Sequence, residues 1–198
     1  MDEFRSFIAL EIPRSLQDNF SLLIERLKSV FPLPIHWVQA GNIHLTLKFM
    51  GNISPSTLES LKFGIKPIFE DLEPVALKFS GLGVFPNIHN PKVFWVGMDT
   101  PPTLSLRVNQ IEQLTQSLGI TPENRPFAPH LTLGRINGSS RNEESRKIAG
   151  ISSSVKCDLP NNLFSKYVTI FRSQLSRQGS IYSPLFRCLL YTSPSPRD

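Results

Sequence analysis

The sequence predicts an α+β fold built mainly on antiparallel strands, and two observations favour it. Segments with a strand-like pattern outnumber segments with a helical pattern along the chain. Many of these strands look half-buried, whereas parallel strands that are covered on both faces are apolar throughout. A mixed, mostly antiparallel arrangement is therefore expected in place of a doubly wound parallel sheet.

The first third of the chain contains two strands and a helix. Residues 7–12 are typical of a strand, which Pro13 stops. Apolar side chains recur at helical spacing over 16–30, and Ser15 is the expected N-cap of this helix. A second strand is predicted over 43–49.

The middle of the chain begins with a helix start signal, because Ser54 precedes a proline at the first helical position. The apolar stripe of this helix covers 58–68. A third helix is expected over 104–118, closed by Gly119 at a C-cap position. The polar segment 137–154 is expected to contain a short charged helix. The remaining strands are predicted over 75–85, 92–98, 130–136, 163–171 and 181–190.

Composition bounds the class of protein. The chain has 198 residues, 40% hydrophobic and 19% charged, which suits one domain or two tightly packed lobes. No apolar run reaches the roughly 18–20 residues of a membrane span, and the acidic start lacks the basic region of a signal peptide. Two cysteines cannot supply a disulfide framework or a four-ligand zinc site. We expect a soluble, cytoplasmic protein, whose net charge of +5 leans toward anionic partners such as RNA.

One tetrapeptide occurs twice. His44-Leu45-Thr46-Leu47 and His130-Leu131-Thr132-Leu133 lie 86 residues apart, and two of the four histidines open them. At about one chance in twenty per position, a given histidine acquires Leu-Thr-Leu roughly once in thousands. The repeat therefore indicates an internal two-fold similarity.

Strand geometry assigns chemistry to this repeat. Side chains alternate between faces, so His44 and Thr46 share one face while the leucines point into a core, and His130 and Thr132 do the same. Two imidazoles near pKa 6.5 can act as base and acid together, and threonine hydroxyls can donate to oxyanions. This set suits in-line displacement at a phosphodiester without a metal or another cofactor. Neither a Gly-rich phosphate loop nor an HExxH motif is present.

The paired HxTx motifs resemble those of the two-histidine (2H) phosphoesterases, specifically the RNA 2′,3′-cyclic phosphodiesterases once named 2′-5′ RNA ligases. The match extends over segments 5–13, 42–51, 93–97, 126–135 and 179–185. The resemblance implies two pseudo-symmetric lobes, with mostly antiparallel sheets, that flank a central cleft and each contribute one HxTx strand. It makes residues 1–190 a single two-lobed domain.

The resemblance also implies the reaction. A terminal 2′,3′-cyclic phosphate of RNA, as on tRNA fragments, is hydrolysed to a 2′-phosphomonoester. His44 is the implied proton donor and His130 the proton acceptor, while Thr46, Thr132 and Arg135 bind phosphate. No metal, cofactor or membrane is implied, and a monomer is expected.

Strict alternation raises a conflict at one of these residues. It places Lys48 on the face of His44, but it places Arg135 on the leucine face. Arg135 can reach the cleft only if the strand bends, and Gly134 is the expected place for the bend. Phe49 lies near the first motif, where it can stack on a base or pack in the core; core packing is the expectation.

Other interpretations remain open at this point. The same groups can run the reverse reaction, which joins RNA ends through a 2′-5′ linkage. The cleft can belong to an RNA-binding module without turnover, or to an enzyme for small cyclic nucleotides. The end of the chain, 191–198, is rich in Ser-Pro and resembles translated sequencing-adapter read-through, so it is expected to be non-native or disordered.

Overall fold

The computed structural model describes residues 2–137, 142–155, 157–160, 163–176 and 179–190. Within them, eight strands form one sheet in the order β10-β9-β1-β3-β7-β6-β5, with β2 beside β7, and every recorded pairing is antiparallel. These strands are β1 (Phe4–Glu11), β2 (Ile35–Trp37), β3 (His44–Ile53), β5 (Lys78–Phe85), β6 (Val93–Asp99), β7 (His130–Ile136), β9 (Tyr167–Ser176) and β10 (Gly179–Leu189). A second, small sheet pairs β4 (Val75–Ala76) with β8 (Phe164–Ser165).

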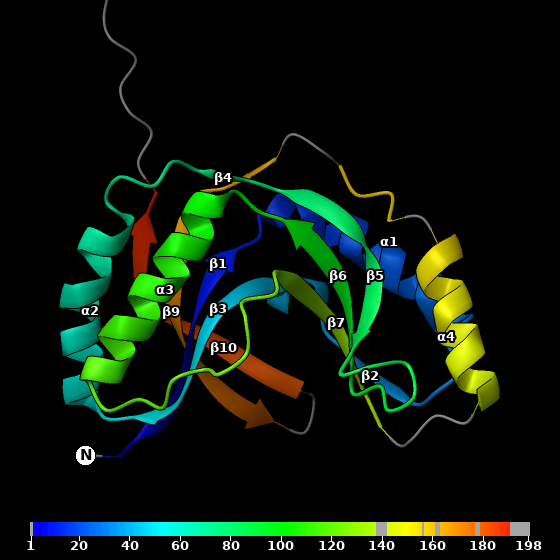
Figure 1. The fold of residues 1–198 in the computed structure, drawn as a ribbon, viewed down its shortest axis with the longest axis horizontal. Coiled ribbons are helices and arrows are strands. Elements are labelled where there is room, and N and C mark those ends of the chain that lie inside the picture. Colours follow the sequence, from blue (N-terminus) through cyan, green and yellow to red (C-terminus); the bar gives the residue numbers. More distant parts are fainter. Residues whose placement is uncertain (1, 138–141, 156, 161–162, 177–178, 191–198) are drawn as a thin grey trace, which may run out of the picture.

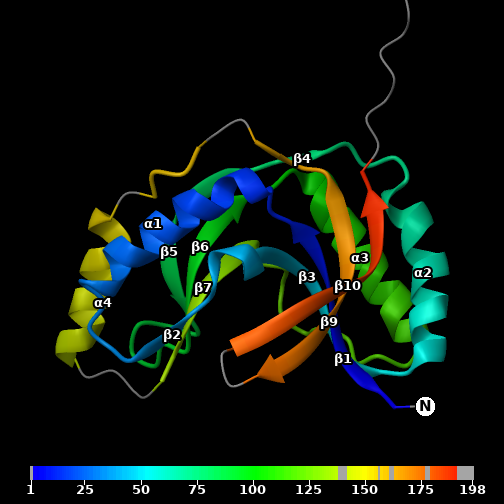
Figure 2. The same cartoon turned by 180° about the vertical axis from the view of Figure 1, so that it is seen from behind.

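The large sheet divides into two lobes at its centre. Strands β3 and β7 pair only through Leu45 and Leu131, and they diverge from that point. On one side β3, β1, β9 and β10 are covered by α2 (Pro55–Phe69) and α3 (Pro102–Ser117); we call this lobe 1. On the other side β7, β6, β5 and β2 are covered by α1 (Gln17–Lys28) and α4 (Asn142–Ser154); we call this lobe 2 (Figures 1 and 2).

A constant offset of 86 residues relates the two halves of the chain. It carries β1 approximately onto β6, α1 onto α3, β3 onto β7 and α2 onto α4. The repeats are not the lobes, however, because α1 packs on lobe 2, where Phe20 meets Phe79 of β5 at 5.9 Å between ring centroids. Its counterpart α3 packs beside α2 on lobe 1. Each lobe therefore combines elements of both repeats.

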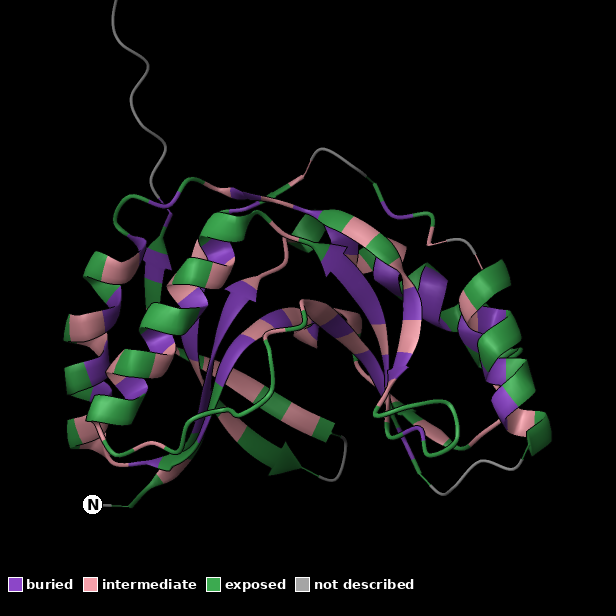
Figure 3. Cartoon of the chain, in the orientation of Figure 1, coloured by how far each residue is buried: buried purple, intermediate pink, exposed green. Residues whose placement is uncertain are grey.

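The core lies between the sheet and the helices, as the burial pattern of β1, β6 and the inner helix faces shows (Figure 3). The predicted helix signals are largely confirmed. The hydroxyl of Ser54 accepts the backbone N–H of Thr57 at 3.1 Å, and Gly119 adopts a positive φ of 79° after α3. Ser15 is not an N-cap, since it lies inside a short 3₁₀ turn, Arg14–Leu16, that precedes α1.

The strand predictions need two corrections. The strand predicted over 75–85 is broken into β4 and β5, and the one over 163–171 is broken into β8 and β9. The sequence analysis also missed β2, whose three residues are too few to show a period. It pairs with β7 on the side opposite β6, next to the point where β3 and β7 diverge.

The last described residues close the sheet of lobe 1. Cys188 and Leu190 are buried, and the backbone N–H of Leu190 donates to the carbonyl of Lys166 at 2.8 Å. The predicted tail, 191–198, lies outside the described residues. Among the described helices, none is both long enough and apolar enough to cross a membrane.

Candidate active site

The two HxTx motifs lie on neighbouring strands at the junction of the lobes. His44 and Thr46 on β3 are half-buried, and the leucines between and after them are fully or nearly fully buried. His130 and Thr132 on β7 show the same pattern. The four polar side chains therefore share one face of the sheet, as alternation predicts.

Both imidazoles are fixed by the same hydrogen bond. His44 Nδ1 lies 2.7 Å from the carbonyl oxygen of Asn42, and His130 Nδ1 lies 2.7 Å from the carbonyl oxygen of Ala128. A carbonyl only accepts, so each Nδ1 carries a proton and donates it. Each Nε2 is consequently left available to exchange protons. The residue two before each histidine supplies the acceptor in both repeats.

Aromatic rings surround each histidine. The ring of Phe7 stacks on His44 with 4.6 Å between centroids, and Tyr182 of β10 meets it edge-on at 5.2 Å. His130 meets Phe85 edge-on at 4.9 Å, and Trp95 lies at 6.3 Å. Such rings hold the imidazole planes and exclude water from one side of them.

This environment favours the neutral form of both histidines. Burial lowers the pKa of His44 to about 4; the Asn42 carbonyl opposes this effect, while the positive charges of His130 and Arg135 add to it. Burial also lowers the pKa of His130, opposed by the Ala128 carbonyl and assisted by the charge of Arg125. The effects of His130 and Arg135 on His44 indicate that charged groups of β7 lie close to the histidine of β3.

Equivalent bulges decide which side chains follow the motifs onto this face. Against β1, Ile8 pairs with Lys48 but Ala9 pairs with Thr46, so Leu47 is an extra residue in β3. Against β6, the same shift leaves Leu133 extra in β7, 86 residues later. A bulge reverses the alternation beyond it.

The bulge of β7 resolves the conflict over Arg135. Leu133 and Gly134 are both buried, and Arg135 is exposed on the face of His130 and Thr132. The strand therefore departs from strict alternation as expected, but the extra residue is Leu133, one position before Gly134. Gly134 fits because Ile35 of β2 packs over it, so a Cβ there would come within 2.5 Å of the Ile35 side chain.

The bulge of β3 overturns two expectations. Lys48 does not lie on the His44 face; it turns into the core, where its Nζ donates to Glu112 of α3 at 2.7 Å and to the carbonyl of Thr121 at 2.9 Å. Phe49 is not a core residue, since it is 56% exposed and lies 86 residues before Arg135, at the equivalent position of β3. Lobe 1 thus presents an aromatic ring where lobe 2 presents a cation.

Sequence reasoning missed other residues of this face. Tyr182 reaches His44 from β10, and only three-dimensional pairing of β9 with β10 brings it there. His36 is exposed and pairs in register with Arg135 across β2 and β7. Arg125 acts on His130 from the segment that leads into β7. No motif in the sequence marks these three positions.

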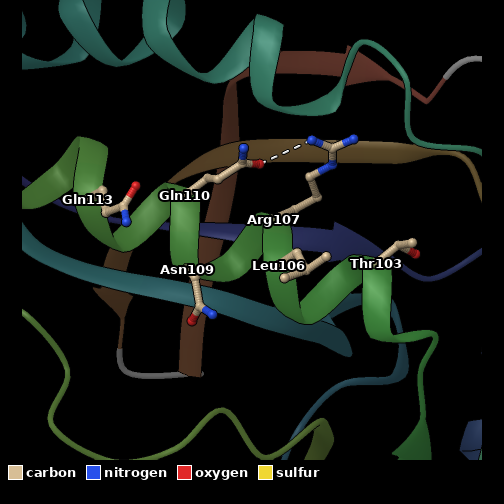
Figure 4. A pocket seen from close by; sticks show the side chains of 6 residues that line it. All are labelled: Thr103, Leu106, Arg107, Asn109, Gln110 and Gln113. Carbon is tan, nitrogen blue, oxygen red and sulfur yellow. Dashed lines mark hydrogen bonds between the residues drawn. The ribbon is translucent and has the colours of Figure 1, made fainter.

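A hollow on the surface lies elsewhere, on the outer side of α3 (Figure 4). Within it the Arg107 guanidinium donates to Gln110 at 3.1 Å. It contains one cation and no acid or base, so it does not suit proton transfer. Its lining consists of Thr103, Leu106, Arg107, Asn109, Gln110 and Gln113.

The fold and the paired motifs define a two-histidine phosphoesterase, in which two related strands bring one histidine each to a shared face. The model of the family of LigT-like phosphoesterases matches the chain twice, over residues 10–95 and 96–182. The chain belongs to this family. The two matches begin 86 residues apart, in agreement with the offset between the repeats.

Proteins with known names are similar over most of the chain. An RNA 2′,3′-cyclic phosphodiesterase of Methanothermobacter thermautotrophicus is 29% identical over 181 residues, covering 91% of this chain and 96% of its own. One of Aquifex aeolicus is 31% identical over 154 residues, covering 74% and 80%. These relatives are similar in length as well as in sequence.

Solved structures share the fold. The protein TT0787 of Thermus thermophilus superposes with a TM-score of 0.75 at 21% identity, covering 94% of this chain and 97% of its own. E. coli LigT complexed with 3′-AMP superposes with a TM-score of 0.71 at 24% identity, covering 96% and 100%. The two-lobed α+β architecture expected from the sequence is thereby confirmed.

Proposed function

We propose that the chain hydrolyses the 2′,3′-cyclic phosphate at the end of an RNA to a 2′-phosphomonoester. The observation that carries the proposal is the matched pair of imidazoles, each held at Nδ1 by a carbonyl so that both Nε2 atoms serve one space. The names of the relatives agree with this reaction. A net charge of +5 suits an anionic substrate.

The proposed step balances with the side chains present. His130 Nε2 takes a proton from water, and the water oxygen bonds to phosphorus. The bond from phosphorus to O3′ breaks, and His44 Nε2–H gives its proton to that oxygen. The hydroxyls of Thr46 and Thr132 and the guanidinium of Arg135 hold the phosphoryl oxygens, where negative charge develops. Two protonation changes of imidazole therefore accomplish the step without a metal.

In the proposed step, the bound substrate makes His44 a proton donor, because the free site favours its neutral form. A donor must be protonated, whereas burial lowers the pKa of His44 to about 4. A bound phosphate places negative charge against the imidazole, which favours the imidazolium form. The assignment of His44 as donor thus requires that the substrate raise this pKa, and it is part of the proposal.

Phe49 completes the proposed contact with the nucleotide. Its ring is exposed beside Phe7, with 6.0 Å between centroids, and Phe7 in turn stacks on His44. An exposed aromatic ring next to a phosphate site is suited to stack on a base of single-stranded RNA. Since both histidines come from one chain, a monomer is the proposed working unit, acting on RNA ends such as those of tRNA fragments in the cytoplasm.

The test uses an oligoribonucleotide with a 2′,3′-cyclic phosphate end, incubated with the protein in EDTA. We expect the product to gain one water, by mass spectrometry, and to carry a 2′-phosphate. A 3′-phosphate product would reverse the direction of ring opening. Binding without turnover would favour the RNA-binding module, and loss of activity in EDTA would contradict the metal-free step.

A further inference from the structure

The segment between α3 and β7 is anchored to the strand that carries His44. It leaves α3 on lobe 1, passes β3 and enters β7 at His130 (Figure 1). Buried Lys48 holds its start through Glu112 and the carbonyl of Thr121. The backbone N–H of Glu123 donates to the same Glu112 carboxylate at 3.3 Å. Residues 121–123 are thus fixed to lobe 1 by an ion pair and its hydrogen bonds.

This anchored segment presents one guanidinium to solvent. The Glu123 carboxylate accepts from Arg125 Nε and Nη2, both at 2.9 Å, and from the Arg125 backbone N–H at 3.2 Å. These hydrogen bonds lower the pKa of Glu123 to about 2, so it is charged at any working pH. The side chain of Arg125 is nevertheless 84% exposed. A guanidinium has five N–H donors, and this ion pair uses two of them, which leaves one Nη2 proton and both Nη1 protons outside it.

The two arginines of the site lie on different elements. Arg135 lies on β7 itself, on the face of His130 and Thr132, whereas Arg125 lies on the anchored segment, five residues before His130. The charge of Arg125 also helps to lower the pKa of His130. The reacting phosphate must lie between the two imidazoles, where Arg135 and the two threonines serve it. Arg125, on the segment outside β7, is therefore placed to meet a second anion next to the reacting one.

We propose that Arg125 binds the phosphodiester that precedes the terminal nucleotide, so that the chain favours an RNA end over a free nucleoside cyclic phosphate. This proposal rests on the proposed function and deepens it. The Nη1 and Nη2 edge of a guanidinium matches two oxygens of a phosphate, and Glu123 holds the adjacent edge, Nε and Nη2, in place. Contacts to the backbone carry no base information, so the preference is for chain length and not for sequence.

The test compares two substrates in Arg125→Ala: an oligoribonucleotide with a cyclic phosphate end, and a nucleoside 2′,3′-cyclic monophosphate, which lacks the preceding phosphate. We expect kcat/KM to fall about tenfold for the oligonucleotide, as for loss of a charge-assisted hydrogen bond. For the nucleoside substrate kcat/KM stays within about twofold. The salt dependence for the oligonucleotide becomes shallower by about 0.7 in the logarithmic slope.

Arg26→Ala is the matched control, because Arg26 is an exposed arginine of α1 in an ion pair with Asp158 at 3.3 Å. It removes the same charge and changes neither substrate's kcat/KM. Equal losses on both substrates in Arg125→Ala would overturn the proposal, since Arg125 would then act through His130. No loss on either would leave only a solvated ion pair and would also overturn it.

A binding measurement distinguishes failure of the proposed Arg125 subsite from failure of the proposed function. Fluorescence anisotropy gives the Kd of an oligoribonucleotide with a 2′-phosphate end, whether or not the protein turns over. We expect Arg125→Ala to raise this Kd by about tenfold while Arg26→Ala leaves it unchanged. An unchanged Kd in Arg125→Ala would overturn the subsite even if hydrolysis is confirmed.

Discussion

Replacing Lys48 by methionine tests the anchor between β3 and the segment that leads to His130. The Lys48 side chain is 3% exposed and Glu112 is 23% exposed, so the variant leaves a carboxylate with little water and no cation. The carbonyl of Thr121 loses a donor at the same time. Methionine keeps most of the volume of the lysine stem, and cavity formation therefore contributes little.

The expected loss in the free energy of unfolding follows from these contacts. Removing one partner of a fully buried ion pair costs about 3–5 kcal/mol. Glu112 is partly exposed and keeps the N–H of Glu123, which lowers the cost for Lys48→Met to about 2–4 kcal/mol. The double variant Lys48→Met with Glu112→Gln removes both charges and is expected to recover about 1–2 kcal/mol.

Urea denaturation of the wild type, both single variants and the double variant completes a double-mutant cycle. Glu59→Gln is a control, because Glu59 forms an exposed pair with Lys62 at 2.7 Å and should change stability by less than about 1 kcal/mol. The reasoning is refuted if Lys48→Met costs under about 0.5 kcal/mol, or if the two single effects simply add. In the folded variant, kcat/KM should fall because the residues before His130 lose their attachment to lobe 1.

Three further predictions concern the chemistry. His44→Ala and His130→Ala should each abolish turnover while far-UV circular dichroism and the urea midpoint stay near the wild type; turnover within about tenfold of wild type in either would contradict the paired-histidine step. Arg135→Ala should lower kcat/KM for every cyclic phosphate by about 10–100-fold, whereas Phe49→Ala should act mainly on KM by about 3–30-fold; equal kcat losses in both would refute the division between phosphate and base. The pH profile of kcat/KM should be bell-shaped with its maximum below the ordinary pKa of histidine, because the pKa is about 4 for His44 and lowered for His130. At low pH both histidines are protonated and the base is lost, whereas at high pH both are neutral and the acid is lost. A plateau that persists to alkaline pH would contradict this prediction.

Much of this site was predictable because it repeats. His44 and His130 stand in the same tetrapeptide, and a strand with alternating faces defines where they and their threonines lie. The direction of Lys48 was not predictable from the same rule. One extra residue, Leu47, reverses the alternation of side chains in β3. The alternating pattern of the sequence does not reveal this bulge, because Leu47 is apolar and fits the expected pattern. The conflict at Arg135 was the one signal of it.

The packing of the helices was beyond sequence reasoning for a different reason. Gly64 of α2 lies against Leu114 of α3, where a Cβ would come within 2.5 Å of the leucine. These helices belong to different repeats, so their contact depends on how the chain crosses between lobes. Periodicity reports which face of a helix is apolar, but not which sheet covers it.

The departures from internal symmetry explain how a symmetric pair of motifs can serve an asymmetric substrate. Equivalent bulges present Phe49 from lobe 1 and Arg135 from lobe 2 on the common face. The preceding positions differ as well, since Lys48 reaches α3 whereas Gly134 lies under Ile35 and has no room for a side chain. Lys48 therefore anchors the segment that carries Arg125 to lobe 1, and Gly134 offers no equivalent anchor on lobe 2. An RNA end has a base on one side of its cyclic phosphate and a charged backbone beyond it. In the proposed complex, Phe49 of lobe 1 meets the base and Arg135 of lobe 2 meets the cyclic phosphate, which would give the bound end a single direction.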